Sequence, residues 1–323
     1  MEIRPYQKGD EKEILALDRR LEDHPWNRTD LSNWYWKYAD ANPSGKSFIW
    51  VMTEDEKIIA HFAAVPFRLK VFDEEIIASH TIAALVESKY QNRGLLKFIS
   101  DKLFEDLKEN NIPVTYGFPN KRSYTLHKGF MGYSDLIFFD ALKITKPNLV
   151  GKQELPGFHK IDKFGDDFDN LWDSCRKDYK IAVVRNKNYL NWRYIQRPDW
   201  KYFPFGVYKG KTLGGYTVLK LYREDKILRG HILDVFTCSG DKDTLDKLVD
   251  GSLNFFSEHN VDEVTCWIWG NPLFEEVLEE KGFSKENTKI PLVIRMNKQF
   301  DYAEEIKDNM NWYFTMGDST EIF

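Results

Sequence analysis

The chain has 323 residues, about twice the length of a typical domain, so two modest domains or one large domain are both compatible with it. Apolar residues make up 42% and charged residues 30%, which excludes disordered, collagen-like and low-complexity chains. Lysine and arginine total 46 against 51 for aspartate and glutamate, and the net charge of -5 argues against nucleic acid as a main partner.

The first part of the chain predicts a strand, two helices and then three antiparallel strands. Apolar residues at helical spacing indicate the helices, and alternating, β-branched runs separated by Asp-Glu turns indicate the three strands. The expected ranges are 3–6 for the first strand, 10–22 and 31–38 for the helices, and 48–53, 58–72 and 76–86 for the three strands.

A polar segment, ESKYQNRG at 87–94, separates the last of these strands from a helix at about 94–109. A strand that passes through a glycine-containing loop into a helix presents unpaired backbone N–H groups and the positive end of the helix dipole. The segment is therefore suited to binding a phosphate group.

A repeat relates the two halves of the chain. The run ENNIPVT at 109–115 is echoed by EHNVDEVT at 258–265, and Asn120 and Gly132 correspond to Asn271 and Gly282. The offsets lie between 149 and 151 residues, which predicts a tandem duplication. We expect one domain at 1–147 and a second at 158–323, joined by a linker at about 148–157.

The order of elements in the first half resembles the GNAT superfamily of acyl-CoA-dependent N-acyltransferases. In that family a Q/R-x-x-G-x-G/A loop cradles the pyrophosphate of coenzyme A (CoA). Residues 91–96, QNRGLL, match at the first and fourth positions and have Leu96 where the family has a small residue. The segment 117–124, GFPNKRSY, resembles the stretch in which an Asn and a small residue three positions later pack against the cofactor.

The resemblance implies an α/β (α+β) fold of two GNAT-like domains, each a mostly antiparallel mixed sheet flanked by helices. It implies acetyl-CoA or another acyl-CoA as the acyl donor and no metal. The residues expected to bind it are Leu85, Val86, Gln91, Asn92, Arg93, Gly94, Leu95, Leu96, Asn120, Ser123 and Tyr124. In the second half the corresponding loop carries Asp241 and Asp243, which would repel a pyrophosphate, so we expect one CoA site per chain.

His80 is the first candidate for a catalytic base. It lies eleven residues before Gln91, where related histone-acetylating enzymes place a catalytic glutamate, and an imidazole is suited to taking a proton at neutral pH. The alternative is a strand histidine bonded to a neighbouring carbonyl. His231 occupies the equivalent position in the second half and favours that structural alternative.

Three further side chains are catalytic candidates. His127 lies seven residues after Asn120, where many GNAT enzymes carry the tyrosine that protonates the leaving thiolate, and Tyr124 competes for the same role. His127 could instead be a packing residue of its helix. Glu87, beside the phosphate loop, is either a base or a solvated turn carboxylate.

The acceptor site is expected along the aromatic segment near residue 36. By the resemblance, Trp34, Trp36 and Tyr38 lie on a wall of that site, although an aromatic stripe of this kind is also typical of a core. Asp234 interrupts an apolar strand of the second half, and it either binds the acceptor or pairs with an arginine in the core.

Localisation and cysteine chemistry are inferred from features that the sequence lacks. No stretch approaches the roughly 18 apolar residues of a membrane span, and the first residues do not resemble a signal peptide, so we expect a cytoplasmic protein with no membrane contact. Cys175, Cys238 and Cys266 are too scattered for a disulfide framework or a zinc site and are expected to be buried apolar residues.

The expected function is transfer of an acetyl or longer acyl group to a primary amine of a small molecule. A nucleotide-linked amino sugar for surface polysaccharide is one acceptor class, and a homodimer is left open. One alternative is an aminoacyl-tRNA-dependent peptidyltransferase of cell-wall cross-bridges, which the retained loop and the negative charge disfavour. A second alternative is a non-catalytic acyl-CoA sensor.

Overall fold

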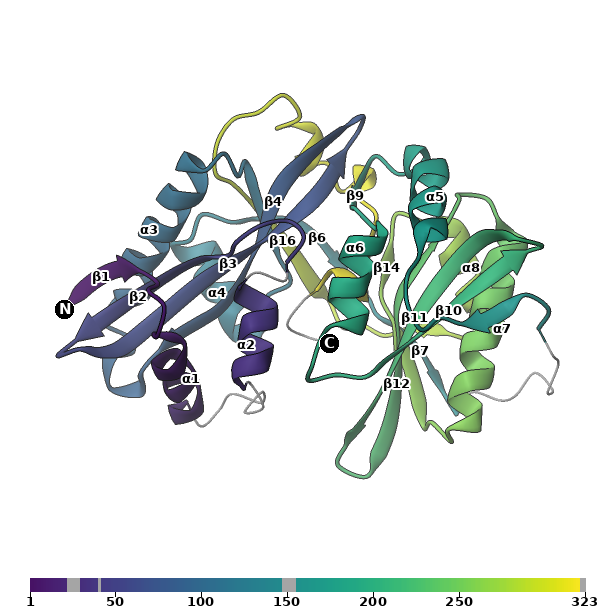
Figure 1. Ribbon diagram of the computed structural model, residues 1–323, viewed down its shortest axis with the longest axis horizontal. Coiled ribbons are helices and arrows are strands. Elements are labelled where there is room, and N and C mark those ends of the chain that lie inside the picture. Colours follow the sequence, from purple (N-terminus) through teal and green to yellow (C-terminus); the bar gives the residue numbers. More distant parts are fainter. Residues whose placement is uncertain (22–29, 40–41, 147–154, 320–323) are drawn as a thin grey trace.

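The computed structural model describes residues 1–21, 30–39, 42–146 and 155–319. These residues form two large, mainly antiparallel mixed sheets, each flanked by helices, which lie side by side (Figure 1). This arrangement confirms the predicted α/β class.

The first sheet has the strand order β1-β2-β3-β4-β5-β16-β6, and β9 pairs with β3 beside this path. Phe62 on β3 packs against Phe104 of α3, whereas Phe67, on the opposite face of the same strand, packs against Trp192 of the second half. Both faces of β3 are therefore buried. The elements of this half are β1 (Glu2–Pro5), α1 (Glu11–Arg20), α2 (Leu31–Tyr38), β2 (Phe48–Glu54), β3 (Lys57–Val71), β4 (Glu74–Val86), α3 (Leu95–Glu109), β5 (Val114–Gly117), α4 (Lys121–Gly129), β6 (Ser134–Phe139) and β7 (Leu142–Thr145).

The second sheet has the strand order β15-β7-β13-β12-β11-β10-β8. Helix α7 covers one face, where Thr244 contacts the backbone of Gly215, and α5 covers the other, where Phe168 contacts Tyr216. The elements of this half are β8 (Phe158–Lys160), α5 (Asp166–Cys175), β9 (Ile181–Val183), α6 (Lys187–Leu190), β10 (Tyr202–Lys209), β11 (Thr212–Glu224), β12 (Ile227–Thr237), α7 (Lys242–Glu258), β13 (Glu263–Cys266), β14 (Ile268–Trp269), α8 (Pro272–Glu280), β15 (Ser284–Lys285), β16 (Ile290–Met296) and β17 (Phe314–Thr315).

The two halves exchange a strand. β16, from the second half, lies between β5 and β6 of the first sheet, and β7, from the first half, lies between β13 and β15 of the second. Each sheet is therefore completed by the other half of the chain. The predicted domains at 1–147 and 158–323 each hold most of one sheet, but no single cut separates the two sheets, and most of the predicted linker lies outside the described residues.

Indole contacts also join the halves. Trp36 of α2 and Trp192, in the π-helical turn at Asn191–Ile195, stack at 5.0 Å between ring centroids. The indole N–H of each donates a hydrogen bond to the backbone carbonyl of the other, at 2.7 and 3.2 Å. Because both indoles are buried, these bonds satisfy donors that could not reach water.

The cysteine prediction is wrong for two of the three residues. Cys175, at the end of α5, and Cys238, just after β12, form a disulfide across 63 residues of sequence. Packing of α5 on the sheet creates this proximity, which no local spacing indicates. Cys266 is a buried free thiol, as expected.

None of the described helices is long and apolar enough to cross a membrane.

Candidate active site

The first sheet opens between β4 and β5. Among the described residues, these parallel strands pair only at Ser79 with Thr115 and at His80 with Tyr116, and no described strand pairs with β4 on that edge from there to Val86. Backbone N–H donors along the opening are thus available to a ligand. The opening leads to the loop that precedes α3.

The loop has the geometry of an anion site. Asn92 and Gly94 have φ of 62° and 76°, and Gly94 directly precedes the first turn of α3. The first N–H groups of that helix have no partner within it, and the helix dipole adds positive potential there. The loop and helix terminus therefore fit a pyrophosphate.

Gln91 anchors this loop. Its side-chain N–H donates to the carbonyl of Val86 at 3.0 Å, and its Oε1 accepts a hydrogen bond from Arg122 at 3.2 Å. Lys89 and Arg93 lie over the Tyr90 ring, 4.6 and 5.4 Å from its centroid. Three cations thus surround the loop, and sequence reasoning did not single out Arg122, although it follows Asn120 by two residues.

Asn120 and Ser123 form hydrogen bonds with each other at the start of α4. The Asn120 Oδ1 accepts hydrogen bonds from the Ser123 N–H at 2.9 Å and from its hydroxyl at 3.1 Å. Asn120 is therefore the N-cap of α4. Contact of either residue with a cofactor stays a prediction.

The structure brings His80 and His127 together at Gly117, the last residue of β5. A Cβ built on Gly117 would lie 3.7 Å from Nε2 of His80 and 3.9 Å from Nε2 of His127. Because glycine has no side chain, the two imidazoles converge where β4 and β5 part. Of the four catalytic candidates, these two share one location.

His127 has the tautomer that a base requires. Its Nδ1 lies 2.7 Å from the carbonyl oxygen of Ser123, which can only accept, so Nδ1 carries the proton and Nε2 the lone pair. Burial lowers the pKa of His127, which keeps the ring neutral at pH 7.

His80 stacks on Tyr116, with ring centroids 5.4 Å apart. Burial, with a smaller contribution from the charge of His127, lowers the pKa of His80 to about 3. His80 is thus a neutral polar group at physiological pH and a poor acceptor of an ammonium proton.

Tyr124 and Glu87 are engaged elsewhere. The Tyr124 hydroxyl donates to Asp135 at 2.9 Å on β6. Glu87 lies 3.2 Å from the Lys57 amine and 3.7 Å from the Arg20 guanidinium, on the side of β4 that faces β3. Neither side chain converges with the histidine pair on Gly117.

Strand geometry distinguishes the backbone donors of β4. The Glu87 N–H donates to the Ile59 carbonyl in β3, and Leu85 pairs with His61 in the same register. Since successive residues of a strand direct their N–H groups to opposite edges, Val86 has its N–H on the open edge, and Leu85 does not.

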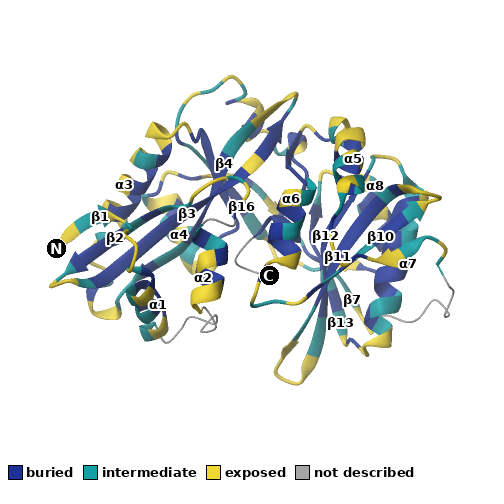
Figure 2. Ribbon diagram, viewed as in Figure 1, coloured by how far each residue is buried: buried dark blue, intermediate teal, exposed yellow. Residues whose placement is uncertain are grey.

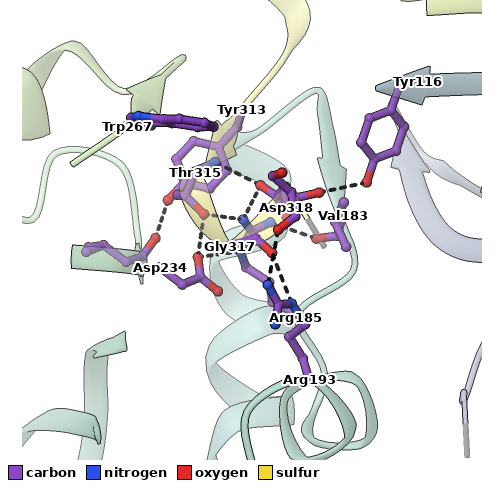
Figure 3. Close-up of polar contacts among 12 residues, drawn as sticks. Tyr116, Val183, Arg185, Arg193, Asp234, Trp267, Tyr313, Thr315, Gly317 and Asp318 are labelled. Atoms are coloured by element: carbon purple, nitrogen blue, oxygen red, sulfur yellow. Dashed lines mark hydrogen bonds and ion pairs between the residues drawn. The ribbon is translucent and has the colours of Figure 1, made fainter. Parts of the chain in front are cut away.

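Helix α2 has exposed residues on its outer side (Figure 2), but the predicted acceptor residues on this helix are buried. Trp34, Trp36 and Tyr38 are all buried, and Trp36 stacks on the second half of the chain. Asp234 is also buried, and its carboxylate pairs with Arg185 at 3.2 Å and accepts the hydroxyl group of Thr315 (Figure 3). It also accepts the hydroxyl groups of Tyr194 and Tyr216. Of the two alternatives for Asp234, the structure therefore shows the pairing with an arginine in the core.

The C-terminal segment fills the corresponding opening of the second sheet. β12 and β13 pair from Arg229 to Ile232 and then part. Residues 313–318 lie against the rest of β12: the Tyr313 hydroxyl bonds to the Val235 carbonyl, and a Cβ on Gly317 would lie 3.2 Å from the Leu233 carbonyl oxygen. This opening therefore holds the protein's own backbone.

Arg185 is expected to contribute strongly to the stability of the folded protein. It bridges Asp234 and Asp318, at 3.2 and 2.7 Å, and all three side chains are buried (Figure 3). Arg185→Met leaves two carboxylates without their cation and should lower the free energy of unfolding by about 3–5 kcal/mol in urea titrations. Lys307→Met, which breaks an exposed pair with Glu304, should change it by less than about 1 kcal/mol. An Arg185 variant as stable as the Lys307 control would contradict this account.

Buried histidines predict a loss of stability in mild acid. Burial lowers the pKa of His61 to about 4, that of His80 to about 3, and that of His231 well below 6.5. The unfolded chain then binds more protons than the folded one, so the free energy of unfolding should fall as pH drops from about 6.5 towards 4. Urea titrations at pH 7.5, 6.0 and 5.0 measure this slope. Replacing the exposed His159 by Gln should leave this slope unchanged. A urea midpoint that does not change with pH would refute the predicted role of the buried histidines.

A cavity of about 490 Å³ lies where the halves meet. Polar and apolar atoms contribute about equally to its lining, which consists of Pro43, Asp162, Lys163, Asn188, Asn191, Trp192, Ile195 and Gln196. The Phe67 ring contacts both Trp192 and His80, with its centroid 6.1 and 6.4 Å from theirs. Among the described residues, no group of three or more His, Cys, Asp or Glu side chains could hold a metal ion.

Comparison with known proteins identifies the fold. Residues 2–132 match the family model of an acetyltransferase (GNAT) domain. A GCN5-related N-acetyltransferase from Anabaena variabilis aligns with a TM-score of 0.67 and 13% identity over 92% of this chain and 73% of its own. N-myristoyltransferase from Saccharomyces cerevisiae with bound myristoyl-CoA aligns with a TM-score of 0.63 and 14% identity, over 93% and 83%. A search of curated proteins by sequence finds no match.

Proposed function

Because residues 2–132 match the family model of a GNAT acetyltransferase domain, we propose that the protein transfers an acyl group from acyl-CoA to a primary amine of a small molecule. The observation that carries this proposal is the convergence of His80 and His127 on Gly117, at the opening between β4 and β5. Of the two, the His127 imidazole, with its lone pair on Nε2, is suited to moving a proton beside a bound thioester, and His80 is a neutral polar neighbour.

The proposed roles follow from the chemistry. Bound acyl-CoA supplies the thioester that the amine attacks. The N–H groups at Gly94 and the first turn of α3 bind its pyrophosphate, and the Val86 N–H faces its acyl arm. His127 takes the proton from the attacking nitrogen at Nε2 and returns it to the departing sulfur, so no proton is gained or lost by the enzyme.

The cavity where the halves meet supports a polar acceptor. Amide side chains of Asn188 and Gln196 line it, and its volume lies in the range of small-molecule sites. Hydroxyl-rich amines pair well with such amides, so we favour an amino sugar, including a nucleotide-linked one, as the acceptor. Trp192, which lines the cavity, contacts Phe67, and Phe67 in turn contacts His80.

A thiol-release assay tests the proposal. The protein is mixed with acetyl-CoA and a panel of amino sugars, aminoglycosides, polyamines and peptides, and the acylated product is identified by mass spectrometry. We expect amine-dependent release of CoA with an amino sugar among the best acceptors. Binding of acetyl-CoA with no release for any amine would instead favour a non-catalytic acyl-CoA sensor.

A further inference from the structure

His61 is a buried histidine of β3 that has no part in the proposed acyl transfer itself. Its side chain is fully shielded from solvent and meets the Tyr38 ring edge-on, with centroids 5.9 Å apart. Its Nδ1 lies 2.9 Å from the carbonyl oxygen of Ala83 in the neighbouring β4. Because that oxygen can only accept, Nδ1 carries the proton. Burial lowers the pKa of His61, which keeps the ring neutral in this tautomer.

The carbonyl that His61 holds belongs to a β-bulge. The pairing of β3 with β4 shifts between His61 with Leu85 and Ala63 with Ile82, so two residues of β4 lie opposite Phe62. Ala83 has φ of 51°, in the left-handed region that residues with a Cβ avoid. Such a conformation persists only where the surroundings hold it, and bulges often redirect groups at functional sites.

The bond to His61 fixes the direction of one backbone donor. In a trans peptide the carbonyl of Ala83 and the N–H of Ala84 point in opposite directions. Since the carbonyl turns towards His61 on β3, the Ala84 N–H turns towards the open edge that faces β5. Strand alternation from Val86 gives the same direction, because Ala84 precedes it by two residues.

We propose that His61 is a positioning residue that holds the β4 bulge so that the Ala84 N–H donates to the acyl carbonyl oxygen. This inference rests on the proposed function, since it concerns the acyl group of the same bound acyl-CoA. His61 does not touch the reacting atoms. It acts through the backbone of Ala83.

Three substitutions separate this role from simple packing. His61→Asn places an amide N–H near the position of Nδ1 and can keep the bond to Ala83. His61→Gln carries its amide one carbon further out, near the position of Nε2, and His61→Leu has no donor at all. The three side chains have similar bulk, so melting temperatures of all variants provide the control for folding.

The most direct readout needs binding and no turnover. The infrared band of acetyl-CoA labelled with carbon-13 at the thioester carbonyl should move to lower wavenumber on binding to the wild type, because a backbone N–H polarises that bond. We expect His61→Asn to keep this shift and His61→Gln and His61→Leu to lose it. The same band position in all four proteins would overturn the proposal.

Kinetics with the acceptor found in the thiol-release panel give a second readout. Removing one donor to a developing oxyanion typically costs about 100-fold or more in kcat. His61→Leu and His61→Gln should show such a loss with KM for acetyl-CoA within about threefold, and His61→Asn should recover most of it. An Asn variant as slow as the Leu variant would refute the role of the Nδ1 bond. If wild-type protein binds no acetyl-CoA, the proposed function itself fails.

Discussion

Gly94→Glu is expected to abolish the thermal stabilisation that CoA gives to this protein. A ligand at 100 times its dissociation constant stabilises the folded state by about 2.7 kcal/mol, which corresponds to a rise of about 4 °C in the melting temperature of a chain of this size. A glutamate at Gly94 puts a carboxylate beside the pyrophosphate and a side chain where the loop must approach it closely. The measurement is a thermal melt with and without millimolar CoA.

The second half of the chain offers a matched control for this variant. Gly240 precedes α7 in the corresponding loop, with φ of 83°, and a Cβ there meets nothing within 4 Å, as at Gly94. Gly240→Glu therefore carries the same conformational cost and the same charge change. We expect it to lower the melting temperature of the free protein as Gly94→Glu does, and to keep the full response to CoA. An equal loss of response in both variants would rule out the first-half loop as the site.

His127→Ala is expected to reduce kcat by about 100-fold to 10,000-fold while the affinity for acyl-CoA stays nearly constant. This is the usual contribution of a general acid or base that acts on the reacting atoms. Since burial lowers the pKa of His127, the activity of the wild type should be constant above pH 6.5 and should fall only on the acid side of that value. His80→Ala should have a smaller effect, because a pKa of about 3 makes His80 a weak base.

His259 provides the control for this experiment. It ends α7 with its Nδ1 2.7 Å from the carbonyl of Phe255, four residues earlier, which reproduces the bond from His127 to Ser123. His259→Ala removes the same local interaction in the other half and should leave kcat unchanged. Steady-state kinetics from pH 5.5 to 9 compare the variants. A wild-type profile in His127→Ala would exclude proton transfer by this side chain.

The local features of the site were predictable from the sequence because neighbouring residues encode them. The polar loop at 87–94 and the helix after it follow from glycine placement and helical periodicity, and the family match supports the assignment. His80 and His127 could be named from their spacing to Gln91 and Asn120. Their meeting at Gly117 could not, since it depends on how α4 packs against the first sheet.

Contacts between distant segments were beyond sequence reasoning. β7 and β16 each pair with strands of the other half, and the choice of a pairing partner that is distant in sequence leaves no local signal. The same holds for Arg185, whose carboxylate partners lie 49 and 133 residues away. His61 was overlooked because its significance depends on a bulge in the neighbouring strand.

The sequence predicts one CoA site per chain, because two aspartates in the second-half loop would repel a pyrophosphate. The structure gives a further reason to expect no site in the second half. Lys209 pairs with Asp241, so that carboxylate is partly neutralised and would be a weaker barrier to a phosphate than the sequence alone suggests. The stronger barrier is the C-terminal segment, whose Tyr313 and Gly317 occupy the opening beside β12. An acyl arm could enter there only if this segment left the core.

A calorimetric titration of the full chain with acetyl-CoA tests the central claim, that one acyl-CoA site lies in the first half. The account predicts a stoichiometry of one acetyl-CoA per chain, with heat that disappears in Gly94→Glu and persists in Gly240→Glu. A stoichiometry of two, or binding that survives Gly94→Glu, would contradict it.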